Sequence, residues 1–83
     1  MYSNLIGKTR NVVVEFYMRS CSMRIAGKVN EVDEVFVEVL VWINNETGEF
    51  AADKETFAQA AAGAAGWRDD RILINIDDIS VIA

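Results

Sequence analysis

The sequence predicts a single, mainly β domain: a small five-stranded barrel with one helix inserted between its third and fourth strands. Three observations lead to this fold class. Short runs rich in β-branched and aromatic residues, which favour strands, occupy most of the chain. Gly27 interrupts the second of these runs, where small barrels need a sharp bend or a bulge. One helical pattern, at residues 53–67, separates the third run from the last.

The first three strands follow from composition and alternation. Residues 11–19 are rich in valine and aromatic side chains and form the first predicted strand. In the second, Met23, Ile25, Gly27 and Val29 share one face and Ser22, Arg24, Ala26 and Lys28 share the other. The third covers residues 34–44 and is apolar on both faces, so we expect both faces to be covered.

An inserted segment, residues 44–70, is expected to contain a turn and then the only convincing helix. Asp53 is the expected N-cap and Gly66 the expected stop signal. The expected apolar stripe is narrow and consists of Phe57, Ala61, Ala64 and Ala65. So little apolar area predicts a helix that packs on the outside of the sheet, anchored by Phe57, with Trp67 packing back on it. Residues 71–83 then form two short strands broken at Asp77 and Asp78.

Size and composition predict self-association in a cytoplasmic protein. A domain of 83 residues buries only about 60% of its unfolded surface, yet 52% of these residues are hydrophobic. A subunit interface is the expected place for the surplus. No run approaches the roughly 18 apolar residues of a membrane span. The first ten residues lack the order of a signal peptide, and one cysteine cannot form an internal disulfide.

Charge and residue types make an enzyme unexpected. Asp and Glu number 13 against 8 Lys and Arg, which argues against broad binding to phosphate backbones but leaves room for a local basic site. The chain has no histidine, so Cys21 lacks the partner that a thiolate nucleophile needs. The acidic pairs at 69–70 and 77–78 lack the glycine-bearing loop of a calcium site. We therefore expect no catalytic residues, no metal and no cofactor.

Two motifs are similar to those of the Sm and LSm family. The first is the order Gly27-x-Val29-x-x-Val32-Asp33-x-x-Phe36-x-x-x-Leu40, and the second is the apolar frame Ile74, Ile79 and Ile82. The resemblance covers about 70 of the 83 residues, omits the 44–70 segment, and looks most like a divergent, phage-type branch. It implies an Sm-like, SH3-like barrel in a single domain of residues 1–83. Another SH3-like barrel and an OB-like barrel are the alternatives.

The family's RNA-base pocket is only partly present. The family forms it from an aspartate and an asparagine in the first motif and an arginine and a glycine in the second. Here Asp33 is retained, but Val37, Asn75 and Ile76 replace the other three. Valine supplies no donor or acceptor to a base edge. Asp33 and Asn75 are the candidate base contacts, although Asp33 also suits a turn and Asn75 a solvated strand position. Lys8, Arg10, Arg24 and Lys28 are candidates for a phosphate-binding rim, or simply solubilising charges.

The resemblance also implies a ring. In the family, the fifth strand of one subunit pairs with the fourth strand of the next. The apolar last segment predicts the same contact here, through Ile72, Ile74, Ile76, Ile79, Val81 and Ile82. We expect a cytoplasmic homo-oligomer of about five to seven subunits that binds single-stranded RNA as a scaffold or chaperone. The alternative is a structural or protein-interaction module, for instance in a phage particle, that kept the ring and lost the pocket.

Overall fold

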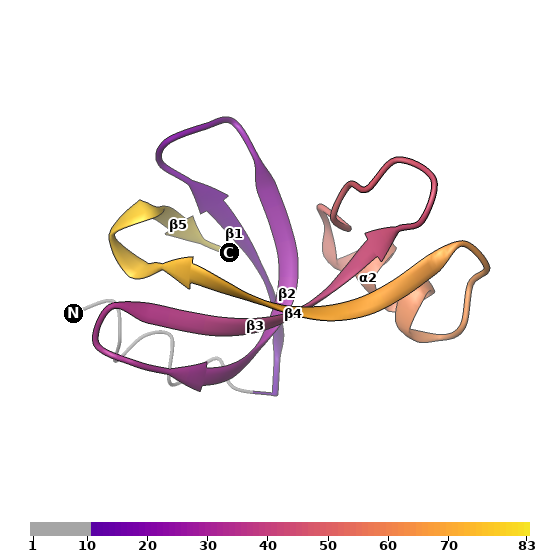
Figure 1. Ribbon diagram of the computed structural model, residues 1–83, viewed down its shortest axis with the longest axis horizontal. Coiled ribbons are helices and arrows are strands. Elements are labelled where there is room, and N and C mark those ends of the chain that lie inside the picture. The colour runs from indigo at the N-terminus through magenta and orange to yellow at the C-terminus, as the bar shows by residue number, and fades with distance from the viewer. Residues whose placement is uncertain (1–10) are drawn as a thin grey trace.

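The computed structural model describes residues 11–83, in which five antiparallel strands form one strongly curved sheet (Figure 1). Its elements in chain order are β1 (Val13–Met18), β2 (Arg24–Val32), β3 (Phe36–Asn44), α2 (Lys54–Ala61), β4 (Trp67–Asn75), the 3₁₀ turn η1 (Ile76–Asp78) and β5 (Ile79–Ile82). The mainly β character and the helix between the third and fourth strands are therefore confirmed.

The sheet has two edges. Its hydrogen-bonded order is β4-β3-β2-β1-β5, so β4 and β5 lie at opposite edges and are not paired with each other within residues 11–83. Along the chain, β1 to β3 form a meander in which each strand pairs with the next, and β5 returns to pair with β1. The described part of the chain thus forms an open sheet, without the strand pairing that closes a barrel.

The concave face of the sheet carries the main core. Strand alternation sends every second side chain to this face, as the sequence predicts. The core consists of Val14, Phe16, Ile25, Val29, Val37, Val39, Val41, Ile43, Ile74, Ile76 and Ile79, all buried. The expectation that both faces of β3 are covered holds only in part. Trp42, on the convex face of β3, packs against the helix cluster, whereas Phe36, at the start of the strand, stays 41% exposed.

Gly27 brings β2 and β3 close together rather than marking a bulge. A Cβ at this position would overlap Cγ1 of Val39 and lie 3.0 Å from the backbone oxygen of Leu40. The shift in the β2–β3 register comes later, between Val29 and Glu31. Of the bend or bulge predicted at Gly27, the bulge lies further along the strand, and the glycine allows close approach of a neighbouring strand.

Helix α2 ends earlier than predicted. Its N-cap is Asp53, as expected, but its last residue is Ala61 and the stop signal is Gly63 rather than Gly66. Gly63, with φ of 100°, donates its N–H to the oxygen of Ala60 at 3.1 Å, and the next residue, Ala64, donates to Gln59 at 3.2 Å. These two bonds form the Schellman motif that closes many helices. Gly66 also has a positive φ, but it lies just before β4.

The helix docks on the convex face of the sheet, as predicted. Phe57 and Ala60 are its buried residues, and Phe57 packs in a second apolar cluster with Ala26 of β2 and Ala51. Val13, Trp42 and Trp67 border this cluster. The expected stripe is wrong beyond Phe57, because Ala61, Ala64 and Ala65 are exposed. The early stop at Gly63 takes the last two of them off the helix.

Replacing Phe57 by alanine should cost about 3 kcal/mol of unfolding free energy, because Phe57 is 4% exposed and fills the space between helix and sheet. Chemical denaturation followed by the fluorescence of Trp42 and Trp67 measures the loss. Gln59→Ala, on the exposed side of the same helix, is the control and should change little. Equal stability of both variants would contradict the docked helix.

Strand β4 begins four residues before the predicted start, at Trp67 rather than at residue 71. All nine of its residues pair with β3, from Asn44 opposite Trp67 to Phe36 opposite Asn75. The composition of residues 68–70 is that of a loop, but pairing with β3 holds them in a strand. The insertion between β3 and β4 is consequently shorter than the predicted 44–70. It lies at one end of this strand pair, and the β2–β3 turn lies at the other end (Figure 1).

Candidate functional site

Two turns from distant parts of the sequence meet at one end of the sheet. The β2–β3 turn, residues 33–35, lies beside η1, and we call this the turn end (Figure 1). The backbone N–H of Ile76 donates to the oxygen of Val35 at 2.9 Å, and Phe36 pairs with Asn75 in the adjoining strands. The structure therefore brings Asp33 and Asn75, the two predicted base contacts, to the same end of the molecule.

The side chains of Asp33 and Asn75 both accept hydrogen bonds from the backbone of their own turns. An Asp33 carboxylate oxygen accepts the backbone N–H of Glu34 at 2.7 Å, and the Asp33 N–H donates to the oxygen of Phe36 at 2.8 Å. The Asn75 side-chain oxygen accepts the backbone N–H of Asp77 at 2.9 Å and so caps η1. The turn role of Asp33 is thus the one observed. Val37, which stands at the family's asparagine position, is completely buried in the core.

The predicted basic rim does not gather at the turn end. Lys8 and Arg10 lie outside the described residues. Arg24 begins β2, whereas Asp33 follows the last residue of that nine-residue strand, so the two lie at opposite ends of β2. Lys28 is halfway along the strand and half-buried. Of the four predicted cations, the two that the structure describes are therefore remote from the predicted base contacts.

Arg24 is held on the convex face by an aromatic partner. Its guanidinium donates to the Tyr17 hydroxyl at 3.3 Å and lies 5.7 Å from the centre of that ring. This hydrogen bond is the main reason why the pKa of Arg24 is raised, and the carboxylates of Glu15 and Asp53 act in the same direction. These contacts orient Arg24 toward the helix side of the sheet.

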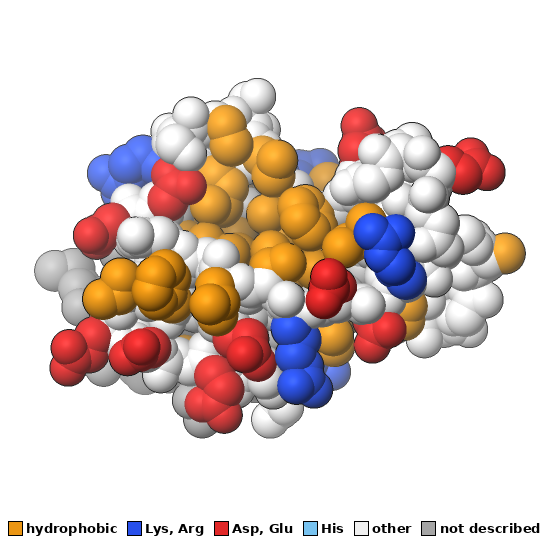
Figure 2. Space-filling view, in the orientation of Figure 1, with side chains coloured by type: hydrophobic (Ala, Val, Ile, Leu, Met, Phe, Trp, Pro, Cys, Tyr) orange, Lys and Arg blue, Asp and Glu red, His pale blue; other side chains and the backbone are white. Residues whose placement is uncertain are grey.

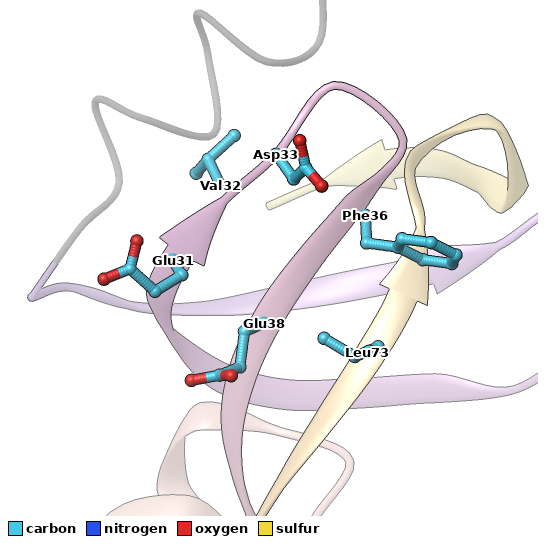
Figure 3. Close-up of a pocket in the computed structure, with 6 residues that line it drawn as sticks. All are labelled: Glu31, Val32, Asp33, Phe36, Glu38 and Leu73. Carbon is cyan, nitrogen blue, oxygen red and sulfur yellow. The ribbon is translucent and has the colours of Figure 1, made fainter.

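A groove of about 350 Å³ opens at the turn end (Figure 3). Its lining combines apolar side chains from three strands with carboxylates: Glu31, Val32, Asp33, Phe36, Glu38 and Leu73. Glu31 of β2, Glu38 of β3 and Leu73 of β4 form one cross-strand row. In Figure 3 the two glutamates lie on the β2 side of the groove and the Phe36 ring lies over β4. The predicted site residue Asp33 is thus part of an acidic, apolar groove.

Five of these lining residues were not predicted as site residues: Glu31, Val32, Phe36, Glu38 and Leu73. The sequence carries a partial signal for three of them, because acidic residues flank Phe36 on both sides between positions 31 and 38. Leu73 has no such signal. Only the β3–β4 register, which pairs Leu73 with Glu38, shows that it belongs to the groove.

The predicted oligomer interface is largely used inside the subunit. Ile74, Ile76 and Ile79 are buried core residues, and Ile72 and Ile82 pack partly against that core. Val81 alone of the predicted set has its side chain largely outside, at 52% exposed. Leu73, which the prediction did not name, is 63% exposed. These two exposed side chains belong to β5 and β4, the two edge strands.

The N-cap of α2, Asp53, should make the docking of this helix sensitive to acid. Backbone and side-chain hydrogen bonds from Thr56, aided by the charge of Arg24, lower the pKa of Asp53 below its usual 3.8. A carboxyl group with a lowered pKa stabilises the folded protein fully when the pH is above its pKa in the unfolded chain. This contribution is lost as the pH falls through its pKa in the folded protein. Acidification from about pH 5 to below the usual pKa of 3.8 should therefore weaken helix docking.

The variant Asp53→Asn isolates this effect, because asparagine also caps helices but does not titrate in this range. Thermal melts of both proteins across that pH range should show a smaller acid loss in the variant. All other carboxylates are common to the two proteins. Parallel melting curves would contradict the assignment.

No protein-family model, no curated protein and no solved structure matches this chain. Residues 11–83 contain no group of three potential metal ligands. In the same part of the chain, no helix has the length and apolar character needed to span a membrane.

Proposed function

We propose that this protein is a self-assembling structural or protein-interaction module, whose copies join edge to edge into an Sm-like ring of about five to seven subunits. The observation that carries this proposal is the open sheet. Its edge strands, β4 and β5, are the two strands that the family resemblance pairs between neighbouring subunits.

Edge geometry supports a contact between these two strands. A sheet edge presents backbone N–H and C=O groups that can pair with another chain. Because β4 and β5 are different surfaces, their contact is heterologous, and repeating it with a suitable rotation closes a ring. Each subunit sheet would then continue into the next, so that a strand of the neighbouring subunit pairs with each edge of the sheet formed by residues 11–83.

Exposed apolar side chains support the same contact. Leu73 on β4 and Val81 on β5 are among the most exposed large hydrophobic residues of the described chain. Leu73 lies in a cross-strand row with Glu38, and Val81 lies opposite Tyr17. Residues 72–75 of β4 and 79–82 of β5 carry no charged side chain, and an uncharged apolar edge is usually covered by a partner. Edge-to-edge assembly would cover Val81 and the outer side of Leu73, away from the Glu38 side, and would take up part of the hydrophobic surplus.

Single-stranded RNA is the second candidate ligand. The proximity of Asp33 and Asn75 at the turn end favours it, because the family resemblance places a base pocket there. The carboxylates of Glu31 and Glu38 in the same groove disfavour it, since they repel phosphates. Both predicted base contacts also hold turns. The interaction module is therefore the better-supported function.

Light scattering coupled to size exclusion tests the assembly at micromolar concentration. We expect a mass of about five to seven times the 9.3 kDa chain. A well-folded monomer would overturn the ring. Fluorescence anisotropy with uridine-rich and adenosine-rich oligonucleotides, at two salt concentrations, tests the second candidate. Binding in low salt that falls steeply with added salt would favour RNA over the protein-interaction reading.

A further inference from the structure

The groove at the turn end joins two features that point to one kind of ligand. Phe36 and Leu73 form apolar walls and remain 41% and 63% exposed. Glu31, Asp33 and Glu38 line the same groove with carboxylates (Figure 3). The space-filling view also shows acidic side chains around an apolar strip at the turn-end side of the molecule (Figure 2). The groove volume of about 350 Å³ is in the range of small ligand sites.

The arrangement of two of these carboxylates is unfavourable in the free protein. Glu31 and Glu38 are direct cross-strand partners, on β2 and β3. Like charges in this position destabilise an antiparallel pair. An amide N–H of Asn30 donates to one carboxylate oxygen of Glu38, but this hydrogen bond brings no positive charge. A ligand with a positive charge would relieve the repulsion.

We propose that this groove binds a segment of another protein in which a bulky apolar residue is flanked by lysine or arginine. The apolar residue packs between Phe36 and Leu73, and the flanking cations face Glu31 and Glu38. This inference rests on the proposed role as a protein-interaction module, but not on the ring. Charge complementarity selects the occupant: an anionic strand is repelled, and a bare cation leaves the apolar walls uncovered.

Fluorescence anisotropy with a labelled peptide of sequence GRKLLKRG tests the proposal on the intact chain. We expect a dissociation constant of roughly tens of micromolar, weakened by added salt. Two control peptides separate the contributions. GRKSSKRG keeps the charges and loses the apolar residues, whereas GEELLEEG keeps the apolar residues and reverses the charges. Both should bind much more weakly than the first.

The double variant Glu31→Gln/Glu38→Gln should weaken binding of GRKLLKRG about tenfold. Its melting temperature should equal or exceed that of the parent, because like-charge repulsion is removed. A merely structural role for these glutamates would lower the melting temperature instead. Glu46→Gln, an equally conservative change in the turn after β3, is the matched control and should leave binding unchanged.

The proposal is overturned if GRKLLKRG does not bind, if all three peptides bind equally, or if Glu46→Gln reduces binding as much as the double variant. Light scattering on the same samples keeps the two proposals apart. A monomer that binds the peptide removes the ring and retains this inference. A ring that does not bind it removes this inference alone.

Discussion

Replacing Gly27 by alanine is expected to lower the unfolding free energy by about 3 kcal/mol. The new Cβ would overlap Cγ1 of Val39, a core residue with no exposed surface, and would lie 3.0 Å from the backbone oxygen of Leu40. Neither atom is at the end of a flexible side chain, so β2 and β3 have to separate. Urea denaturation monitored by circular dichroism measures the loss.

A double-mutant cycle with Val39→Ala tests whether the overlap with Val39 causes the loss of stability in Gly27→Ala. Val39→Ala removes the overlapping methyl group, so Gly27→Ala should cost less in that background than in the parent. Gly48→Asn is the control substitution, because no atom lies within 4 Å of its Cβ position and asparagine tolerates the positive φ of 72°. Additive losses in the cycle would contradict close packing of Gly27 against Val39.

Replacing Val81 by lysine is expected to dissociate the proposed ring while leaving the subunit folded. A lysine on an edge strand blocks pairing with another strand, and a buried unpaired charge costs several kcal/mol. We expect each subunit contact to weaken by about 3 kcal/mol, roughly a hundredfold, so that light scattering gives the 9.3 kDa mass of a single chain. Because Val81 is 52% exposed in the subunit, the circular dichroism spectrum should not change.

The substitution is a cleaner test than deletion of residues 79–83. Ile79 is a core residue, and Ala83 exchanges two backbone hydrogen bonds with Glu15 of β1, at 2.9 and 3.0 Å. Deletion would therefore damage the subunit as well as the edge. Val12→Lys serves as the control, because Val12 is 54% exposed and lies outside both edge strands. If both lysine variants keep the mass of the parent, β5 is not part of an assembly contact.

Residue pattern alone predicts most of the secondary structure. The alternation of Ile25, Gly27 and Val29 on one face of β2 and the N-cap at Asp53 are both observed. These features depend on contacts within a few residues, where side-chain direction and hydrogen bonding to the nearby backbone decide the outcome. The end of α2 was harder to predict, because Gly63 and Gly66 are both suitable stop signals.

The candidate site was only partly predictable, because local motifs can be recognised in the sequence and contacts between strands cannot. Asp33 was found because it belongs to a local motif, and it does lie in the groove. Arg24 was assigned to a phosphate-binding rim on charge alone, but the fold places Tyr17 beside it on the neighbouring strand. A charged residue can be recognised in a sequence, whereas its partner depends on strand register.

The sequence by itself determined a small, mainly β domain with one helix before the fourth strand, because alternation, turn residues and caps act locally. Only the tertiary structure decided that β4 starts at Trp67, that β4 and β5 are not paired with each other within residues 11–83, and that Leu73 lies in one row with Glu38 and Glu31. These outcomes depend on pairing between residues up to 39 positions apart, such as Phe36 and Asn75, and a shift of one residue in that pairing would move every side chain to the opposite face. Such pairing is set by the packing of the whole core, which no local spacing records.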